Sequence, residues 1–331
     1  MESNRGILVC GEVADEKMTA TTQELMTMGR KLGDGLQQPL NVLVIGKNLE
    51  KVAQEAISFG ANKVYSVQGT FFSELNPDNY AAIIVKVCQQ ITPSVILLGQ
   101  TDIGRDVAPR LAAKLGIPVT MDCTELNIDP VTKEILQTKP VYGGNAMAIW
   151  VTQSNQAQIV TMRPKSVMAD KPDPSRKGEI ISFNPTIDDS MTKVKLLETV
   201  KEEMKGIRLE EAKVIVAGGG GIGGRDGFKL LEELAKVLGG TIGVTRVPCD
   251  EGWTSVNLQV GQTGHIVSPD LYVAVGISGA LQHMAGCSNS KLIAAINKDP
   301  EAHIFKYADF GVVGEYRDVL PALISKLKEF A

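Results

Sequence analysis

Residues that bind metals are scarce in this chain. Its 331 residues include only three histidines, at positions His265, His283 and His303. The five cysteines are scattered, and no two of them have the spacing of metal ligands: Cys10, Cys88, Cys123, Cys249 and Cys287. We therefore expect no metal site and no iron–sulfur cluster, and we interpret the cysteines as reduced thiols of a reducing compartment.

Long hydrophobic runs, targeting signals and an excess of one charge are also missing. No apolar run approaches the length of a membrane span. No secretion or transit signal precedes the first strand-like run, which starts at Gly6, so we expect a cytoplasmic protein or a processed mature form. Lysine and arginine total 34 against 38 acidic residues, and the net charge of -4 argues against nucleic acid as the main partner.

The length and the alternation of apolar patterns predict the fold. A chain of 331 residues is long enough for two domains. In the first half, short apolar runs at 7–10, 42–45, 64–67 and 95–98 alternate with helical patterns near 20–33, 49–58, 78–91 and 104–115. Such alternation indicates a parallel sheet with helical crossovers. After about Cys123 the pattern favours β-hairpins, one of them joining 147–151 to 158–162 through a turn at Ser154 and Asn155.

A polar, proline-bearing segment at 171–178 indicates an exposed connection near the end of the first half. We predict an N-terminal α/β domain over 1–190 that carries a partner-subunit interface, a linker region over 191–212, and a ligand-binding domain over 213–331. The fold class is α/β, with two domains that are each a doubly wound, mostly parallel sheet. A β-rich extension ends the first domain.

A glycine-rich loop opens the second domain. An apolar strand at 214–217 runs into seven residues of which six are glycine, 218–224, and a helical pattern follows at 228–238. Strand, glycine loop and helix together bring backbone N–H groups against a pyrophosphate, although a tight turn is the alternative reading. The acidic residue of a plain NAD fingerprint is absent, because Thr245 and Arg246 follow the next strand, 241–244.

Three further segments of this domain are typical of ligand contacts. The apolar strand 271–275 breaks into a glycine turn at 276–279, followed by a predicted helix start at 280–283. A second apolar run, 292–296, ends on Asn297 at the carboxyl edge of its strand, where ligands of open α/β sheets bind. The pentapeptide 260–264, VGQTG, follows a predicted strand at 256–260, and a plain strand-capping turn is its alternative.

These segments, in this order and at this spacing, resemble the signature of the electron transfer flavoprotein alpha subunit. The resemblance is close over the C-terminal domain and looser over the first domain, where 98–110 also matches. It implies a bound FAD, and a redox carrier with no catalytic residues of its own that passes electrons from flavin dehydrogenases to a further acceptor. It implies a heterodimer with a beta subunit and a dehydrogenase partner of the acyl-CoA dehydrogenase type. Simple and electron-bifurcating versions both stay open.

The resemblance also implies roles for individual residues. Arg246 should lie against the isoalloxazine ring, Thr263 at flavin N5, Gln262 on the C4=O side and His283 at the N1–C2=O edge. The pyrophosphate and ribityl cradle should be formed by the run Ser278, Gly279, Ala280, Leu281 and Gln282, and Asn297 should contact the adenosine half. The predicted contacts also include Thr245, Val260 and Gly261.

Two positions depart from the family pattern. Gly220 stands where relatives often have an arginine, so we expect Arg225 or backbone N–H groups alone to neutralise the pyrophosphate. Glu315 and Tyr316 replace an aspartate followed by an aliphatic residue and are kept as predicted contacts. Two rivals come from other classes: a pyridine-nucleotide enzyme, such as a transhydrogenase-like or deoxyhypusine-synthase-like protein, and a nucleotide-sensing scaffold without a redox role.

Overall fold

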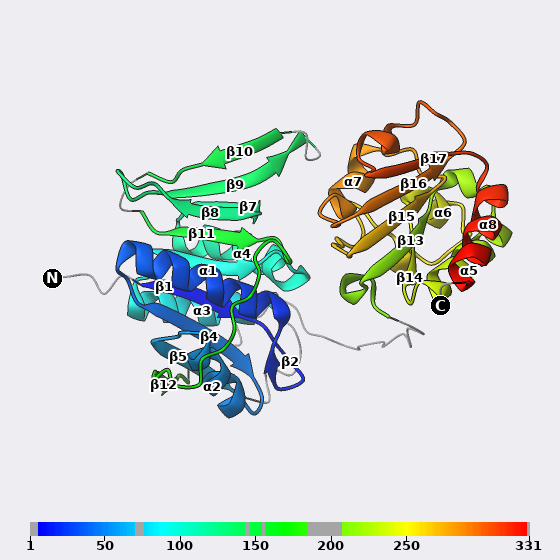
Figure 1. Cartoon of the computed structure of the whole chain (residues 1–331). Coiled ribbons are helices and arrows are strands. Elements are labelled where there is room, and N and C mark those ends of the chain that lie inside the picture. Colours follow the sequence, from blue (N-terminus) through cyan, green and yellow to red (C-terminus); the bar gives the residue numbers. More distant parts are fainter. Residues whose placement is uncertain (1–5, 70–75, 143–145, 154–155, 185–206, 330–331) are drawn as a thin grey trace. The chain divides into compact units, whose positions relative to one another are not determined.

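The computed structural model describes residues 6–69, 76–142, 146–153, 156–184 and 207–329. The chain divides into two compact units, one built on a seven-stranded sheet and the other on a five-stranded sheet. Figure 1 shows the first in blue to green and the second in yellow-green to red. The predicted α/β class with two mostly parallel sheets is therefore confirmed. The predicted linker lies outside the described residues over 191–206, so the domain boundaries stay predictions.

The large sheet of the first unit is entirely parallel. Its strand order is β12-β5-β4-β1-β6-β11-β7. The strands are β1 (Ile7–Gly11), β4 (Leu40–Gly46), β5 (Lys63–Gln68), β6 (Val95–Gly99), β7 (Val119–Cys123), β11 (Gln158–Met162) and β12 (Glu179–Ser182). Its helices are α1 (Ala20–Leu36), α2 (Glu50–Ser58), α3 (Pro77–Ile91) and α4 (Asp102–Leu115).

Both faces of this sheet are buried, which explains the uninterrupted apolar runs of its strands. In β1, Ile7 and Val9 belong to a core shared with α1 and α2, whereas Leu8 and Cys10 belong to a core shared with α3 and α4. Successive side chains of a strand point to opposite faces, so one apolar run supplies both cores.

The β-rich extension is a separate sheet of β8 (Glu125–Ile128), β9 (Ile135–Val141) and β10 (Ala146–Trp150), with β9 in the middle. The predicted hairpin between 147–151 and 158–162 is wrong, because β10 lies beside β9 while β11 pairs in parallel between β6 and β7. All five residues of β11 are buried, as suits a central strand. The turn predicted for that hairpin, Ser154 and Asn155, lies outside the described residues. A short ribbon of β2 (Val13–Ala14) and β3 (Lys17–Met18) completes the unit.

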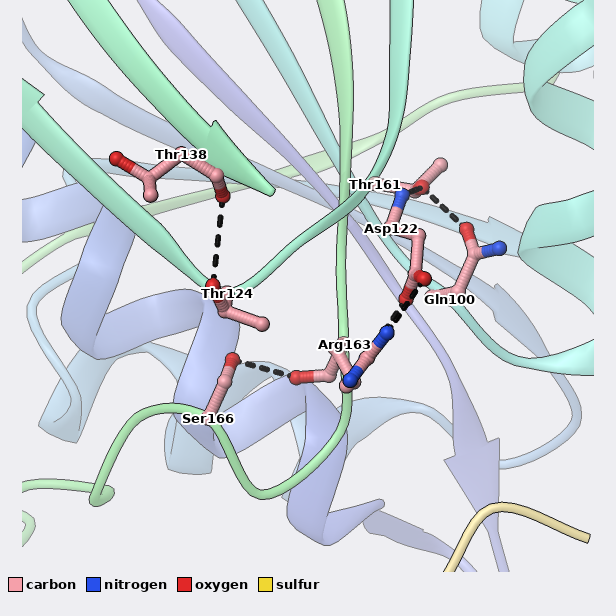
Figure 2. A network of polar contacts seen from close by, with 7 residues as sticks. All are labelled: Gln100, Asp122, Thr124, Thr138, Thr161, Arg163 and Ser166. Atoms are coloured by element: carbon pink, nitrogen blue, oxygen red, sulfur yellow. Dashed lines mark hydrogen bonds and ion pairs between the residues drawn. The ribbon is translucent and has the colours of Figure 1, made fainter. Parts of the chain in front are cut away.

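In the first unit, hydrogen-bonded side chains fill the space at the carboxyl ends of the sheet strands. The buried Arg163, just after β11, donates two hydrogen bonds to the Asp122 carboxylate on β7, at 2.9 and 2.7 Å. Thr161 accepts from the Asp122 N–H and donates to Gln100 after β6 (Figure 2). At the next gap in this edge, between β1 and β6, the Thr101 hydroxyl donates to the Glu12 carboxylate. A cavity there has a volume of only ≈ 10 Å³, so this edge offers little room.

The second unit has the strand order β14-β13-β15-β16-β17, and all four pairings are parallel. The strands are β13 (Val214–Gly218), β14 (Thr241–Val244), β15 (Leu271–Val275), β16 (Ile293–Asn297) and β17 (Phe310–Val313). The helices are α5 (Phe228–Val237), α6 (Arg246–Asp250), α7 (Leu281–Cys287) and α8 (Tyr316–Lys328). α5 and α8 share one core with the sheet, and α7 packs into the core of the other face.

This order places a switch point in the second sheet. The first strand, β13, lies between the second, β14, and the third, β15, so the connections from β13 and β15 leave toward opposite sides. Ligands of doubly wound sheets bind in the crevice that forms at such a point, outside the carboxyl ends of the strands. Among the described residues, no helix has both the length and the apolar character needed to cross a membrane.

Candidate functional site

Two glycine loops meet at the switch point of the second sheet. One follows β13 and the other, 276–279, follows β15. The Gly219 N–H donates to Val275 O at 2.9 Å, and the Gly221 N–H donates to Gly276 O at 3.0 Å. A Cβ at Gly219 would meet Gly276 O at 2.3 Å, which no side chain tolerates. The two backbones can approach this closely only because both loops are built from glycine.

The first glycine loop is also held by a hydrogen bond from Tyr316 of α8. Tyr316, the first residue of α8, is 4% exposed, and its hydroxyl donates to Ile222 O at 2.9 Å. Arg317 donates to the same phenolic oxygen at 3.2 Å. The glycine loop therefore rests on a rigid aromatic side chain, a role for Tyr316 that the sequence did not reveal.

Two adjoining cavities open at these loops. One has a volume of ≈ 580 Å³ and the other of ≈ 480 Å³, both within the usual range of ligand sites. They share Gly221, Gly276, Ser278 and Ala280, so they are neighbours along one crevice. All predicted contact residues except Arg225 line one or both cavities. The larger, which we call the edge cavity, takes Ser278, Gly279, Ala280, Leu281, Asn297, Glu315 and Tyr316. The smaller, which we call the turn cavity, takes Gly220, Thr245, Arg246, Val260, Gly261, Gln262, Thr263, Ser278, Ala280, Gln282 and His283.

Arg225 lies away from both cavities. Its guanidinium donates to Gly252 O at 2.7 Å and to Trp253 O at 3.3 Å, which ties down the turn after α6. The geometry gives no support to its predicted role beside the pyrophosphate. At Gly220 a Cβ would meet Val247 Cγ1 at 3.3 Å, so a side chain there would press against the Val247 side chain and not against backbone.

Arg246 begins α6 directly after β14 and supplies the cation of the turn cavity. Its side chain is 69% exposed, and its Nε lies 3.1 Å from the Asp250 carboxylate one helical turn away. The preceding residue, Thr245, is fixed by its N–H, which donates to Gly218 O at 3.0 Å. The guanidinium is thus placed by a short helix and one ion pair, and its planar face remains accessible to a ligand.

The segment 259–263 also lines the turn cavity. The predicted strand at 256–260 is wrong: 256–258 form a 3-10 turn, and only isolated bridges join Gln259 to Val244 and Val260 to His265. The Ser255 hydroxyl accepts from the Asn257 N–H, and such local capping competes with a strand ladder. Gln262 is anchored by its N–H, which donates to Gln282 O at 2.7 Å.

His283 is buried beneath the turn cavity and has partners at both ring nitrogens. Its Nδ1 lies 3.0 Å from Val260 O, and its Nε2 lies 3.0 Å from the Tyr272 hydroxyl. Because a carbonyl only accepts, Nδ1 carries the proton, and Nε2 of the neutral ring accepts from Tyr272. Burial lowers the pKa of His283 to about 4. A donation to a ligand, as the sequence suggests, would require one of these two hydrogen bonds to exchange.

Asn297 lines the edge cavity, and its side chain is hydrogen-bonded to backbone groups on either side. Its amide donates to Ile277 O at 2.9 Å, and its carbonyl accepts from the Asp299 N–H at 3.0 Å. Three acidic residues, Asp299, Glu301 and Glu315, also line this cavity, and they outnumber Lys298, whose ammonium lies 4.0 Å from the Glu315 carboxylate. Carboxylates suit the hydroxyl groups of a ribose and repel a phosphate, whereas the turn cavity holds Arg246, hydroxyls and amides.

The chemistry of these side chains fits a long, polar dinucleotide with distinct ends. Glycine backbones line the shared middle, where a pyrophosphate needs close approach, and the two cavities differ in charge on either side. Fold and site therefore define a doubly wound dinucleotide-binding protein. Two side chains that build this site, Gln259 and Tyr272, were missed by sequence reasoning because each reads as an ordinary strand or turn residue.

Comparisons with known proteins identify the family. The electron transfer flavoprotein domain matches residues 7–188, and the electron transfer flavoprotein FAD-binding domain matches residues 208–288. The chain is 43% identical to the electron transfer flavoprotein subunit alpha of Thermoanaerobacterium thermosaccharolyticum, over 99% of each chain. It is 40% identical to the subunit alpha of Bacillus subtilis, over 98% of this chain and 97% of the relative.

A third relative belongs to a larger redox enzyme. This is the subunit LctC of the lactate dehydrogenase (NAD(+),ferredoxin) of Acetobacterium woodii, 34% identical over 98% of this chain and 77% of the relative. The chain belongs to the electron transfer flavoprotein family, as an alpha subunit. Its cofactor is FAD and it functions as an electron carrier, so the pyridine-nucleotide alternative is not favoured.

Proposed function

We propose that this chain holds one FAD across the two cavities and exchanges electrons with a flavin dehydrogenase and a further acceptor. The observation that supports this is the convergence of three sequence segments and a glycine loop on one crevice at the switch point. When bound, FAD supplies a ring that accepts and releases electrons reversibly. The other contributions come from the side chains and backbone of this chain.

In the turn cavity we assign the isoalloxazine contacts. Arg246 provides a permanent positive charge that stabilises electron density added to the ring. The Thr263 hydroxyl is assigned to N5, and the Gln262 amide to the C4=O side. His283, neutral and held by Tyr272 and Val260, is assigned to the N1–C2=O edge of the flavin. Its two existing hydrogen bonds fix the imidazole ring, and burial keeps that ring uncharged by lowering its pKa to about 4.

In the shared middle and the edge cavity we assign the rest of the dinucleotide. The N–H groups of Ser278 and Gly279, together with the Ser278 hydroxyl, are assigned to the pyrophosphate, without help from Arg225. Asn297 and Glu315 lie on the adenosine side, where a carboxylate can accept from ribose hydroxyls. Tyr316 contributes by holding the glycine loop through Ile222.

A beta subunit is the proposed partner of the N-terminal unit. β10 is an edge strand of the small sheet, and Met147, Ile149 and Trp150 on it are each at least half exposed. Apolar residues concentrated on one strand mark an interaction surface. The relatives are named as subunits, which supports an occupant from the same electron transfer flavoprotein. For the dehydrogenase we propose the acyl-CoA type.

Two finer assignments concern the mode of action and the location. The relative from a lactate dehydrogenase (NAD(+),ferredoxin) supports membership of an electron-bifurcating complex as a second mode of action. Five cysteines without disulfide partners are compatible with the proposed cytoplasmic location.

The test is the flavin content of the chain co-expressed with the beta subunit of the same organism. One FAD per heterodimer with flavin bands in the visible spectrum is the expected result for a simple carrier, and two for a bifurcating type. The alpha chain alone should be poorly soluble or lose its FAD. A colourless complex that binds NAD would overturn the proposal.

A further inference from the structure

The segment 259–265 closes into a compact ring of hydrogen bonds around Gln259. The His265 N–H donates to Gln259 O at 2.8 Å, and the Gly261 N–H donates to His265 O at 3.1 Å. A Cβ at Gly264 would meet Gln259 O at 2.3 Å, so the turn lies directly on this residue. The Val260 N–H donates to Val244 O at 2.8 Å and ties the ring to the sheet. The backbone of Gln259 is therefore fixed.

The side chain of Gln259 is buried and has a defined target. The residue is 7% exposed, lines the turn cavity and places its Nε2 2.9 Å from the Thr263 hydroxyl oxygen. An amide NH₂ group can only donate, so Thr263 accepts in this contact. Among the residues that the structure describes, Gln259 is the one side-chain partner of that hydroxyl. The hydroxyl proton is thereby left for an acceptor in the cavity.

We infer that Gln259 is a positioning residue that keeps the Thr263 hydroxyl a donor toward the bound cofactor. The inference rests on the proposed function, which assigns Thr263 to flavin N5. Oxidised N5 accepts a hydrogen bond, whereas N5–H of the fully reduced ring donates one. A fixed donor favours the oxidised ring over the fully reduced one, so Gln259 holds the two-electron potential of the flavin at a lower value than Thr263 would without it.

The inference is tested by a double-mutant cycle on the two-electron midpoint potential of the co-expressed heterodimer. Gln259→Met keeps the length of the side chain and removes the amide, and Thr263→Val keeps the shape and removes the hydroxyl. Each variant should raise the potential. The shift caused by Gln259→Met should vanish in the Thr263→Val background, because Gln259 acts through that hydroxyl. Gln90→Met on α3, an exposed glutamine, is the matched control and should leave the potential unchanged.

The outcomes separate the two claims. A heterodimer without flavin bands contradicts the proposed function. A flavin-loaded heterodimer in which Gln259→Met shifts the potential equally with and without Thr263, or not at all, contradicts the positioning role alone. If Gln259→Met does not retain FAD, Gln259→Leu, which also lacks the amide and carries no charge, takes its place in the same cycle. Equal shifts in both backgrounds would then overturn the inference.

Discussion

At the scale of single residues, Arg246 gives the most direct test of the flavin assignment. Replacing it with Ala removes the permanent charge of the turn cavity, and replacing it with Lys keeps a charge without the planar face. Solvent and Asp250 screen the guanidinium, so we expect Arg246→Ala to lower the potential by about 1 kcal/mol, or about 40 mV per electron. The potential of Arg246→Lys should lie between those of Arg246→Ala and the parent protein.

The measurement is a stepwise reductive titration of the heterodimer followed by absorbance. Asp250→Asn is the matched control, because it removes the screening carboxylate and should shift the potential in the opposite direction. Identical potentials in all four proteins would place Arg246 away from the ring.

His283 should make stability depend on pH. Its pKa is about 4 in the folded protein, below the ordinary 6.5, because burial disfavours the charged ring. Between these values the unfolded chain binds a proton that the folded chain does not, so stability rises with pH across this window and falls on acidification. The difference is about 3 kcal/mol at most. Urea unfolding of the heterodimer, followed by far-UV circular dichroism, should show this loss from pH 6.5 to 4.

His283→Asn should flatten that pH dependence. His303→Gln should not, because His303 is exposed. A slope that persists unchanged in His283→Asn would assign the effect to other groups.

At the scale of elements, backbone contact between the glycine loops should control cofactor binding. Gly219→Ala places a methyl group 2.3 Å from Gly276 O, so the loops must separate, at a cost of about 1 to 3 kcal/mol. We expect FAD affinity to fall about ten-fold or more, measured by fluorescence on adding FAD to the apo-heterodimer. Gly46→Ala at the end of β4, in the other unit, is the matched control, since its Cβ meets only Leu49 Cδ2, also at 3.3 Å. Equal affinities of the two variants would contradict this packing argument.

Element prediction succeeded where burial produces a simple pattern. The runs at 7–10 and 214–217 are strands because both faces of each sheet are covered. It failed at 256–260, where Ser255 caps a 3-10 turn, and the strand predicted at 158–162 exists but lies between β6 and β7 and has no hairpin partner. Periodicity reports local burial and does not say which strands pair.

Prediction of the site had a similar limit. Family resemblance located the residues that line the cavities, because those positions recur in a recognisable order. It did not reveal the side chains that act through others: Gln259 behind Thr263, Tyr272 behind His283, and Tyr316 behind the glycine loop. These contacts depend on pairings between distant segments, and no motif encodes them.

At the scale of the whole molecule, β10 should determine assembly. Trp150 is 55% exposed on this edge strand, and buried tryptophans dominate the binding energy of protein interfaces. Trp150→Asp should therefore weaken the heterodimer by about 2 kcal/mol or more, about 30-fold in Kd. Met168→Asp, at a methionine that is 90% exposed outside β10, is the control and should leave Kd unchanged. Analytical ultracentrifugation of the two variants with the beta subunit decides between these outcomes.

The hydroxyl of Tyr316 has a consequence for the order of biosynthesis. It meets the carbonyl of Ile222 across a separation of 94 residues, so α8 leaves the ribosome well after the glycine loop. Translation at roughly 5 to 20 residues per second leaves an interval of about 5 to 20 s between the two partners. Throughout that interval the nascent glycine loop exists without its support. FAD capture should therefore wait until α8 has emerged, and a ribosome-stalled chain that ends before Tyr316 should not retain the cofactor.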